Sequence, residues 1–169
     1  MATNTELIKE LRNRTSAGVM DCKKALDEVN GNVDQAEIIL REKGIASAAK
    51  KADRDTEQGL IETYIHSGGR IAAMVEVNCE TDFVARTEEF SKLAHDIAMQ
   101  VAAMDPKTVE AIQSNPNGAA EKEEEGHSLL QQPFIKDPSK NIQDLINETV
   151  GKLGENIRVR RFKRYSLGE

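Results

Sequence analysis

Residues 60–79 of the chain read Leu60-Ile-Glu-Thr-Tyr-Ile-His-Ser-Gly-Gly-Arg-Ile-Ala-Ala-Met-Val-Glu-Val-Asn-Cys79. Apolar or β-branched side chains recur at every second position on both sides of Ser67-Gly68-Gly69, and a period of two is that of a β-strand. A three-residue loop containing glycine is typical of a turn between antiparallel strands. The stretch therefore predicts a β-hairpin, with these residues alternating along its two strands: Ile61, Thr63, Ile65, Ile71, Ala73, Val75, Val77 and Cys79.

After this hairpin the apolar period becomes that of a helix. Thr87 precedes residues 88–104, whose apolar side chains recur at three- and four-residue spacing, so it is the predicted N-cap of an amphipathic helix. A second such helix is predicted for residues 142–153. Residues 156–165 alternate again and predict a third strand, whose pattern slips at Arg160-Arg161 as in a bulge or a charged edge strand.

The first 44 residues carry only helical patterns, in three short apolar stripes separated by glycine-containing turns. Asn32 with Gln35 has the pattern of a capping box, and Lys43-Gly44 that of a helix C-terminus. We therefore expect an α+β protein. It consists of a three-helix module at residues 1–44, a linker helix at 45–57, and a core at 58–169 in which a small antiparallel three-stranded sheet packs with helices, with a mobile acidic excursion at 107–130.

The composition excludes several classes of protein. The 169 residues carry a net charge of −6, which disfavours wrapping of nucleic acid because RNA and DNA attract basic surfaces. No apolar run approaches the roughly 18–20 residues of a membrane span, and the first residues lack the features of a signal peptide. Cys22 and Cys79 are too few for a disulfide scaffold and match no metal-ligand spacing. We expect a soluble cytoplasmic protein that binds neither nucleic acid directly nor a membrane.

The sequence contains no recognisable catalytic constellation. His66, His95 and His127 fall on a strand end, on a helix and in the acidic excursion, with no nucleophile or carboxylate placed beside them as in known sites. No glycine-rich phosphate loop is present, and the two cysteines are typical of small buried hydrophobic residues. We therefore predict a protein that is not an enzyme and has no catalytic residue, no metal site and no cofactor.

Two segments suit either a core or a contact with another protein. Val19 and Met20 lie at the exit of a predicted loop between helices, where methionine either joins the core or adapts to a partner's irregular surface. Thr81-Asp82-Phe83 follows a strand directly and holds an aromatic at the end of the sheet. Phe83 therefore either caps the core or is a rigid anchor for insertion into another protein.

Two long motifs occur in this chain: Leu11-Arg-Asn-Arg-Thr-Ser-Ala-Gly-Val-Met-Asp-Cys-Lys-Lys-Ala-Leu26 and Val75-Glu-Val-Asn-Cys-Glu-Thr-Asp-Phe-Val-Ala85. In this order they closely resemble the bacterial elongation factor Ts family, and the similarity resumes at residues 132–134 and 154–161. The resemblance implies a ubiquitin-associated-like three-helix module and a core of antiparallel strands flanked by helices. It also implies a guanine-nucleotide exchange factor for elongation factor Tu.

The resemblance assigns roles to individual residues. In relatives the N-terminal module docks on the nucleotide-binding domain of elongation factor Tu in its GDP form. An Asp-Phe pair wedges between two helices there and displaces groups around the magnesium and the phosphates, so that GDP leaves. By motif position, the implied docking residues are Arg12, Val19, Met20 and Lys23. The implied exchange wedge consists of Thr81, Asp82, Phe83 and Val84.

The chain departs from the long members of this family, because the core pattern occurs once and residues 107–130 are too short for their helical protrusion. It resembles the short form, in which two chains together supply what one long chain does. We therefore expect a homodimer through the core. Its predicted pairing surface is the hairpin face with Ile71, Ala73, Val75 and Val77, or the edge strand from Ile157 to Tyr165. Gln100 stands where some relatives have a histidine that approaches the partner.

Two rival functions remain open. One is an adaptor that binds only through its ubiquitin-associated-like module and leaves the nucleotide of its partner alone. The other is a ribosome- or RNA-associated factor, although the aromatic residues that stack on bases are missing from its basic strand. That strand carries Arg158, Arg160, Arg161, Lys163 and Arg164.

Overall fold

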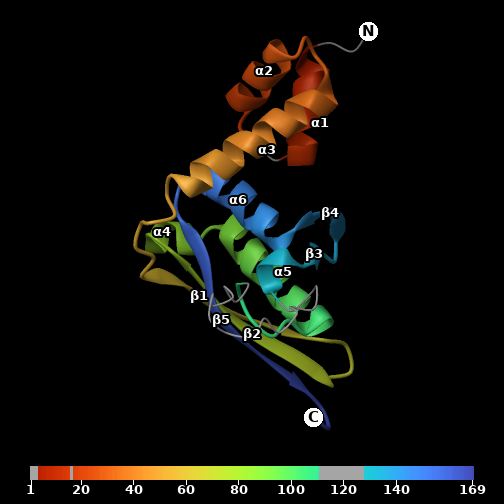
Figure 1. Cartoon of the computed structure of the whole chain (residues 1–169), viewed down its shortest axis with the longest axis vertical. Helices are drawn as coiled ribbons and strands as arrows, with labels where there is room; N and C mark the ends of the chain where they lie inside the picture. Colours follow the sequence, from red (N-terminus) through yellow and green to blue (C-terminus); the bar gives the residue numbers. More distant parts are fainter. Residues whose placement is uncertain (1–3, 16, 111–127) are drawn as a thin grey trace, which may run out of the picture. The chain divides into compact units, whose positions relative to one another are not determined.

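The computed structural model describes residues 4–15, 17–110 and 128–169. They belong to two compact units, one of Met1–Arg54 with Asn147–Asn156 and the other of Asp55–Ile146 with Ile157–Glu169. Three helices come first along the chain, and the strands and the remaining helices follow (Figure 1), so the predicted α+β class is confirmed. The domain boundaries predicted at residues 44 and 58 stay a prediction.

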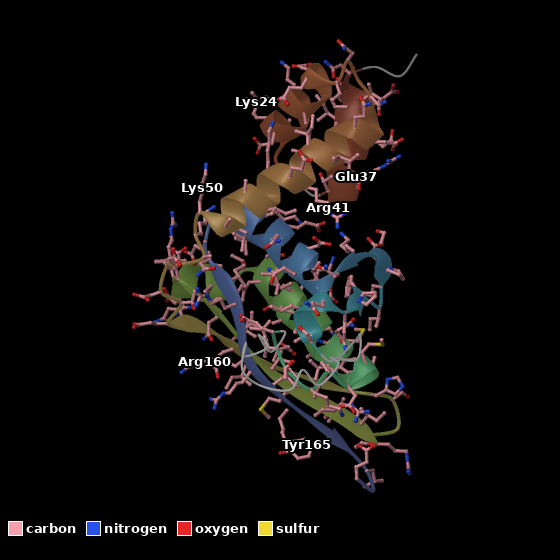
Figure 2. All side chains as sticks on the ribbon, viewed as in Figure 1. Lys24, Glu37, Arg41, Lys50, Arg160 and Tyr165 are labelled. Carbon is pink, nitrogen blue, oxygen red and sulfur yellow. The ribbon has the colours of Figure 1, made fainter. Side chains whose placement is uncertain are left out.

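The predicted hairpin and third strand form an antiparallel three-stranded sheet in the order β1–β2–β5. The strands are β1 (Gln58–Ile65), β2 (Ile71–Cys79) and β5 (Ile157–Ser166). β5 is an edge strand, and Arg160 on it is labelled in Figure 2. Glu76 lies opposite Arg161 while Val77 lies opposite Val159, so Arg160 is the extra residue of a bulge. The slip in the alternating pattern at this point is therefore confirmed as a bulge.

Helix α5 (Glu88–Met104) covers one face of this sheet (Figure 1). Thr87 caps the helix as predicted, since its Oγ1 accepts a hydrogen bond from the Phe90 backbone N–H at 3.2 Å. Burial of a large apolar side chain stabilises the fold by about 1.5–3 kcal/mol. The buried apolar residues of β2 and α5 are Ala73, Val75, Val77, Cys79, Phe90, Leu93, Ala94, Ile97, Ala98, Val101 and Ala102.

This packing contradicts the pairing surface predicted on the hairpin. Ala73, Val75 and Val77 are at most 3% exposed because they lie in the core beneath α5, so they are not free to bind a second chain. Ile61 and Ile65 of β1 lie on the opposite face of the sheet and are 61% and 67% exposed. Both faces of the hairpin carry apolar side chains, and alternation alone does not show which face is covered.

A short second hairpin is present that the sequence did not predict. It pairs β3 (Pro133–Phe134) with β4 (Asp137–Asn141), and two residues are too few to show an alternating pattern. Most of the excursion predicted at 107–130, namely residues 111–127, lies outside the described residues. Its two ends are ordered, because Thr108 and Ser128 form a β-bridge and the turn η1 (Leu129–Gln131) buries Leu129.

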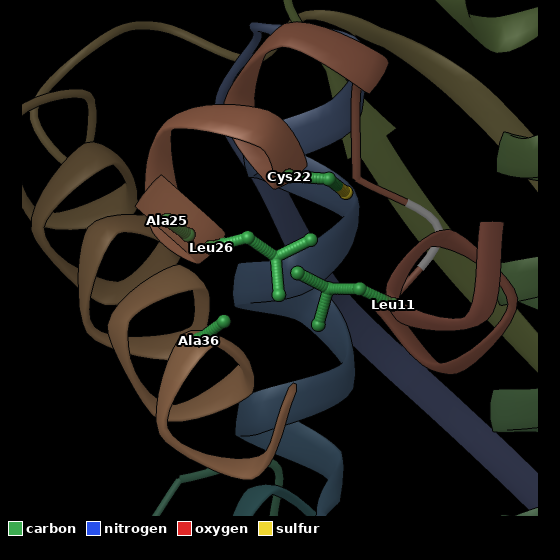
Figure 3. Packing of buried hydrophobic residues seen from close by; sticks show 5 residues of the cluster. All are labelled: Leu11, Cys22, Ala25, Leu26 and Ala36. Atoms are coloured by element: carbon green, nitrogen blue, oxygen red, sulfur yellow. The ribbon is translucent and has the colours of Figure 1, made fainter. Parts of the chain in front are cut away.

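The N-terminal unit contains the three predicted helices, α1 (Asn4–Thr15), α2 (Val19–Glu28) and α3 (Val33–Ala49). The predicted cap of α3 is confirmed, since Asn32 Oδ1 accepts from the Gln35 backbone N–H at 3.1 Å. Leu11 of α1 and Leu26 of α2 face each other at the centre of the module (Figure 3). The buried cluster consists of Leu11, Cys22, Ala25, Leu26 and Ala36.

The predicted end of the third helix at Lys43-Gly44 is wrong, because α3 continues to Ala49. Gly44 lies against the second half of α6 (Ile142–Leu153): a Cβ built on Gly44 would lie 3.7 Å from the carbonyl oxygen of Asn147. A Cβ built on Gly151 of α6 would in turn lie 3.7 Å from the Gly44 Cα. This close packing offsets the roughly 1 kcal/mol that glycine costs inside a helix. Residues 45–49 of the predicted linker therefore belong to α3.

Candidate partner-binding site

Phe83 has the largest exposed fraction, 81%, among the large apolar side chains of the described residues. It lies in α4 (Asp82–Ala85), a single helical turn that follows β2 and contacts both β1 and β2. The interpretation of Phe83 as a cap on the core is therefore wrong. An exposed aromatic at a fixed position is typical of an anchor that a partner protein buries.

Hydrogen bonds hold α4 from both sides. At its start, Thr81 Oγ1 accepts from the Val84 backbone N–H at 3.4 Å, and Cys79 Sγ donates to the Thr81 carbonyl oxygen at 3.1 Å. At its end, Thr87 Oγ1 donates to the Val84 carbonyl oxygen at 2.8 Å. The turn that bears Phe83 is therefore tied to β2 before it and to the start of α5 after it.

Asp82 pairs with Arg86 one turn later, with 2.9 Å between Oδ2 and Nη2. The side chains are 48% and 78% exposed, and such a pair on a helix surface contributes only about 0.3–0.5 kcal/mol. A basic group of a partner can therefore replace Arg86 at little cost. The structure thus brings Thr81, Asp82, Phe83 and Val84 into one turn.

The four predicted docking residues lie on the surface of the N-terminal module. Val19 and Met20 are 48% and 62% exposed at the start of α2, and Lys23 is exposed one turn later. Arg12 is exposed on α1. Met20 is 62% exposed, whereas Cys22 two residues later is fully buried, so the interpretation of Met20 as a core residue is wrong. These residues belong to the first compact unit and the turn with Phe83 belongs to the second.

Gln100 and the two cysteines are interior residues. Gln100 is fully buried and makes its hydrogen bonds inside the core. Burial raises the pKa of the Cys22 thiol, so the thiol stays protonated at neutral pH and is a poor nucleophile. Cys79 is also buried and free. The prediction that both cysteines are small buried hydrophobic residues is confirmed.

Several basic side chains of β5 have partners within the chain. Arg161 Nε lies 2.6 Å from a carboxylate oxygen of Glu76, and Arg160 Nη1 lies 3.7 Å from the other. The hydrogen bond from Arg161 lowers the pKa of Glu76. Arg164 Nε donates to the Ala102 carbonyl oxygen at 3.0 Å. These pairings reduce the positive charge that the strand presents to a phosphate backbone.

Sequence reasoning missed an exposed apolar cluster on the open face of the sheet. Its members are Ile61 and Ile65 on β1, Met74 on β2, and Tyr165 on β5, and each residue is 47–67% exposed. Tyr165 is labelled in Figure 2. The strand register places all four on the same face. We call these four residues the open-face cluster. The signal that could have revealed it is the presence of large apolar residues on both faces of the hairpin.

The histidines of the described residues make contacts with their neighbours. Tyr64 Oη lies 3.2 Å from His66 Nδ1, and His95 Nδ1 lies 3.6 Å from a Glu62 carboxylate oxygen. Within residues 4–15, 17–110 and 128–169, no three histidine, cysteine or acidic side chains gather as a metal site. In the same part of the chain, no helix combines the length and the apolar character needed to cross a membrane.

Known proteins match this chain along nearly its whole length. The family model described as Elongation factor TS matches residues 3–126. The chain is 48% identical to elongation factor Ts of Carboxydothermus hydrogenoformans, with 98% of this chain and 89% of that protein covered. It is 47% identical to elongation factor Ts of Thermoanaerobacter pseudethanolicus, covering 98% and 95%. It is 46% identical to the same factor of Herpetosiphon aurantiacus, covering 99% of each chain.

Proposed function

The chain belongs to the elongation factor Ts family of translation elongation factors, and we propose that it is the guanine-nucleotide exchange factor of elongation factor Tu. It binds that protein in its GDP form and promotes the release of GDP, in the cytoplasm where translation takes place. The observation that carries this proposal is Phe83, an aromatic side chain that is 81% exposed on a turn held at both ends.

In this proposal the turn from Thr81 to Val84 enters the nucleotide-binding domain of elongation factor Tu. The ring of Phe83 inserts between two helices of that domain, and Asp82 enters beside it. The displacement of groups that hold magnesium and the phosphates weakens the binding of GDP. The hydrogen bonds on both sides of α4 support this role, because a group fixed before binding loses little conformational entropy on binding.

No bond is made or broken by side chains of this protein, so the proposed activity is exchange and not catalysis in the usual sense. The exchange factor and GDP each weaken the binding of the other to elongation factor Tu. This coupling free energy is reciprocal: the factor by which the exchange factor weakens the binding of GDP equals the factor by which GDP weakens the binding of the exchange factor. GDP in excess is therefore expected to dissociate the complex of the two proteins.

The N-terminal module supplies docking in this proposal. Val19 and Met20 present exposed apolar surface, and Lys23 and Arg12 add positive charge beside it. Two binding segments on one chain raise the effective concentration of the second once the first has bound. The module therefore increases the affinity, and the turn with Phe83 acts on the nucleotide.

The test is the release of fluorescent GDP from elongation factor Tu, with and without this protein. Phe83→Ala is expected to weaken the complex ~30- to 1,000-fold, because truncation of a buried aromatic anchor costs about 2–4 kcal/mol of binding. Leu167→Ala is the matched control, since Leu167 is also an exposed apolar residue, at 67%, and lies outside the proposed site. Thermal unfolding of both variants is measured in parallel.

Three outcomes contradict the proposal. If this protein does not accelerate the release of GDP, it is not an exchange factor. If Phe83→Ala exchanges like the parent, the wedge is assigned to the wrong residue. If binding to elongation factor Tu occurs without any change in nucleotide release, the chain is the adaptor described above.

The RNA-associated alternative is less well supported by the charges of β5. Arg160 and Arg161 share the carboxylate of Glu76, and Arg164 is bound to a backbone carbonyl. An RNA-binding protein is expected to lose affinity steeply as salt increases and to leave GDP release unchanged. The same fluorescence assay, repeated with RNA at two salt concentrations, separates these functions.

We also propose that two copies of the chain pair through the open-face cluster, in place of the buried hairpin face. Glu76, Arg161 and Lys163 lie on this face with the cluster, and a face with both signs of charge can complement itself across a two-fold axis. Ile65→Glu is expected to convert the dimer into a monomer of 18.7 kDa in light scattering. Ile38→Glu, at an exposed position of α3, is the control. A parent mass of one chain at micromolar concentration would exclude the dimer.

A further inference from the structure

The turn that carries Phe83 is too short to be stable on its own. α4 has four residues, and isolated helices shorter than about 12 residues are marginal even in favourable sequences. Its backbone contributes a bond from the Ala85 N–H to the Thr81 carbonyl oxygen at 3.2 Å. The position of Phe83 therefore depends on the groups that hold the ends of α4.

The Thr87 hydroxyl connects the end of α4 with the start of α5. Its Oγ1 donates to the Val84 carbonyl oxygen at 2.8 Å and accepts from the Phe90 backbone N–H at 3.2 Å. Val84 directly follows Phe83, and Phe90 is fully buried in the core. One hydroxyl thus links the residue next to the exposed aromatic with a residue fixed in the core.

We propose that Thr87 is a positioning residue for exchange, which holds the Phe83 turn in its binding conformation through the hydrogen bond to Val84. This inference rests on the proposed function. The Val84 carbonyl oxygen also accepts from the Thr87 backbone N–H at 3.0 Å. Without the second bond, from the hydroxyl, the last residues of α4 sample more conformations, and binding must then restrict them at a cost in entropy. The hydroxyl itself is expected to make no contact with elongation factor Tu.

The two side-chain hydrogen bonds of Thr87 can be separated by substitution. Thr87→Ser keeps both, because serine retains the hydroxyl. Thr87→Asp keeps only the cap, because a carboxylate accepts from the Phe90 N–H and has no proton to donate to the Val84 carbonyl oxygen. Thr87→Val has a similar shape and keeps neither of these two bonds. The hydrogen bond from the backbone N–H of residue 87 to the Val84 carbonyl oxygen, 3.0 Å long in the parent, remains in all three variants.

Exchange and stability are expected to respond differently to this series. Thr87→Ser should behave like the parent in both. Thr87→Asp should lower the affinity for elongation factor Tu about threefold to tenfold, from the ordering of a few more torsions, with no loss of thermal stability. Thr87→Val should show the same loss of affinity, together with a melting temperature lower by about 2–8 °C, because the cap of α5 is lost.

The experiment measures fluorescent-GDP release over a range of exchange-factor concentrations, in the full chain with and without Phe83→Ala. If Thr87 acts through Phe83, Thr87→Asp should change the affinity by less than about twofold when Phe83→Ala is already present. An equal loss in both backgrounds would indicate direct repulsion of the new charge and would overturn the proposal. Backbone amide exchange in residues 82–86 should become faster in Thr87→Asp and Thr87→Val and stay unchanged in Thr87→Ser.

The role of Thr87 and the proposed function are contradicted by different results. If Phe83→Ala is impaired while Thr87→Asp exchanges like the parent, only the role of Thr87 is wrong. If Phe83→Ala itself exchanges like the parent, the wedge is wrong and the role of Thr87 falls with it.

Discussion

Gln100 on α5 donates a hydrogen bond from its Nε2 to the Oε1 of Gln132, over 3.2 Å, and both side chains are buried. Gln100 Nε2 also donates to the Pro133 carbonyl oxygen, and its Oε1 accepts from the Ile135 backbone N–H at 3.0 Å. Gln132 Nε2 donates to the Met104 carbonyl oxygen at 3.4 Å. Gln100 therefore attaches the β3–β4 hairpin to α5.

We predict that Gln100→Leu destabilises the protein by about 2–3 kcal/mol. A leucine cannot make the hydrogen bonds of Gln100 to the buried Gln132 side chain and to the partly buried Ile135 N–H. Urea unfolding measures the change. Gln131→Leu is the matched control, at an exposed neighbouring position, and should change stability by less than about 0.5 kcal/mol. Unchanged stability of Gln100→Leu would show that the buried amide network contributes little.

Gly59 is expected to be the glycine of β1 that tolerates no side chain. Its φ is +147°, and a Cβ built there would lie 2.1 Å from the Val77 carbonyl oxygen. Gly59→Ala should therefore cost at least about 3 kcal/mol, since backbone strain and a clash with the backbone add. Gly68→Ala should cost only about 1–2 kcal/mol, because a Cβ there meets nothing within 4 Å and only the positive φ of +87° is unfavourable. Equal melting temperatures of the two variants would contradict this reasoning.

Local patterns were sufficient to predict most elements of this fold. The alternation of residues 71–79, the cap at Thr87 and the cap at Asn32 each depend on a few neighbouring residues, so the sequence shows them directly. The bulge at Arg160 was also visible, because one extra residue in a strand shifts every later side chain to the other face. Interactions within a few residues can be predicted without knowledge of the tertiary structure.

The features that the sequence did not show depend on contacts between distant residues. Gly44 continues a helix because Gly151 and its neighbours pack against it, and a glycine in isolation is a signal to end a helix. Ile61 is exposed because α5 covers the other face of the sheet. The exposure of Phe83 likewise follows from how α4 packs on β1 and β2. The sequence alone was therefore compatible with Phe83 as a core residue and with Phe83 as a surface anchor.

The ion pair of Glu76 with Arg161 predicts a pH-dependent part of the stability. The hydrogen bond from Arg161 lowers the pKa of Glu76 in the folded protein. The contribution of this ion pair to the free energy of unfolding is therefore fully present above the ordinary glutamate pKa of 4.5. It is lost as the pH falls through the lower pKa of the folded state. Glu76→Gln should cost on the order of 0.5–1 kcal/mol at pH 7. The parent and the variant should become equally stable in urea unfolding at pH 2–3.

A control for this prediction is ionic strength, because both arginine side chains near Glu76 are 69–76% exposed. At 1 M salt the Debye length is about 3 Å, so the difference between parent and Glu76→Gln at pH 7 should shrink. A difference that persists at pH 2–3 would show that Glu76 stabilises the sheet through packing and not through its charge.

Met20 is expected to affect only how much exchange factor is needed, whereas Phe83 affects both the affinity and the rate of GDP release from the bound complex. Met20→Ala removes exposed apolar contact area from the proposed docking surface of α2. The concentration of exchange factor that gives half-maximal GDP release should therefore rise about tenfold, which corresponds to a moderate interface contact of roughly 1.4 kcal/mol. Because the turn with Phe83 is intact in this variant, the maximal rate of release at saturating concentration should equal that of the parent. Phe83→Ala should lower the maximal rate in addition to weakening the complex. If Met20→Ala lowers the maximal rate while half-saturation is unchanged, the N-terminal module acts on the nucleotide site itself, and the division of roles proposed for the two segments is wrong.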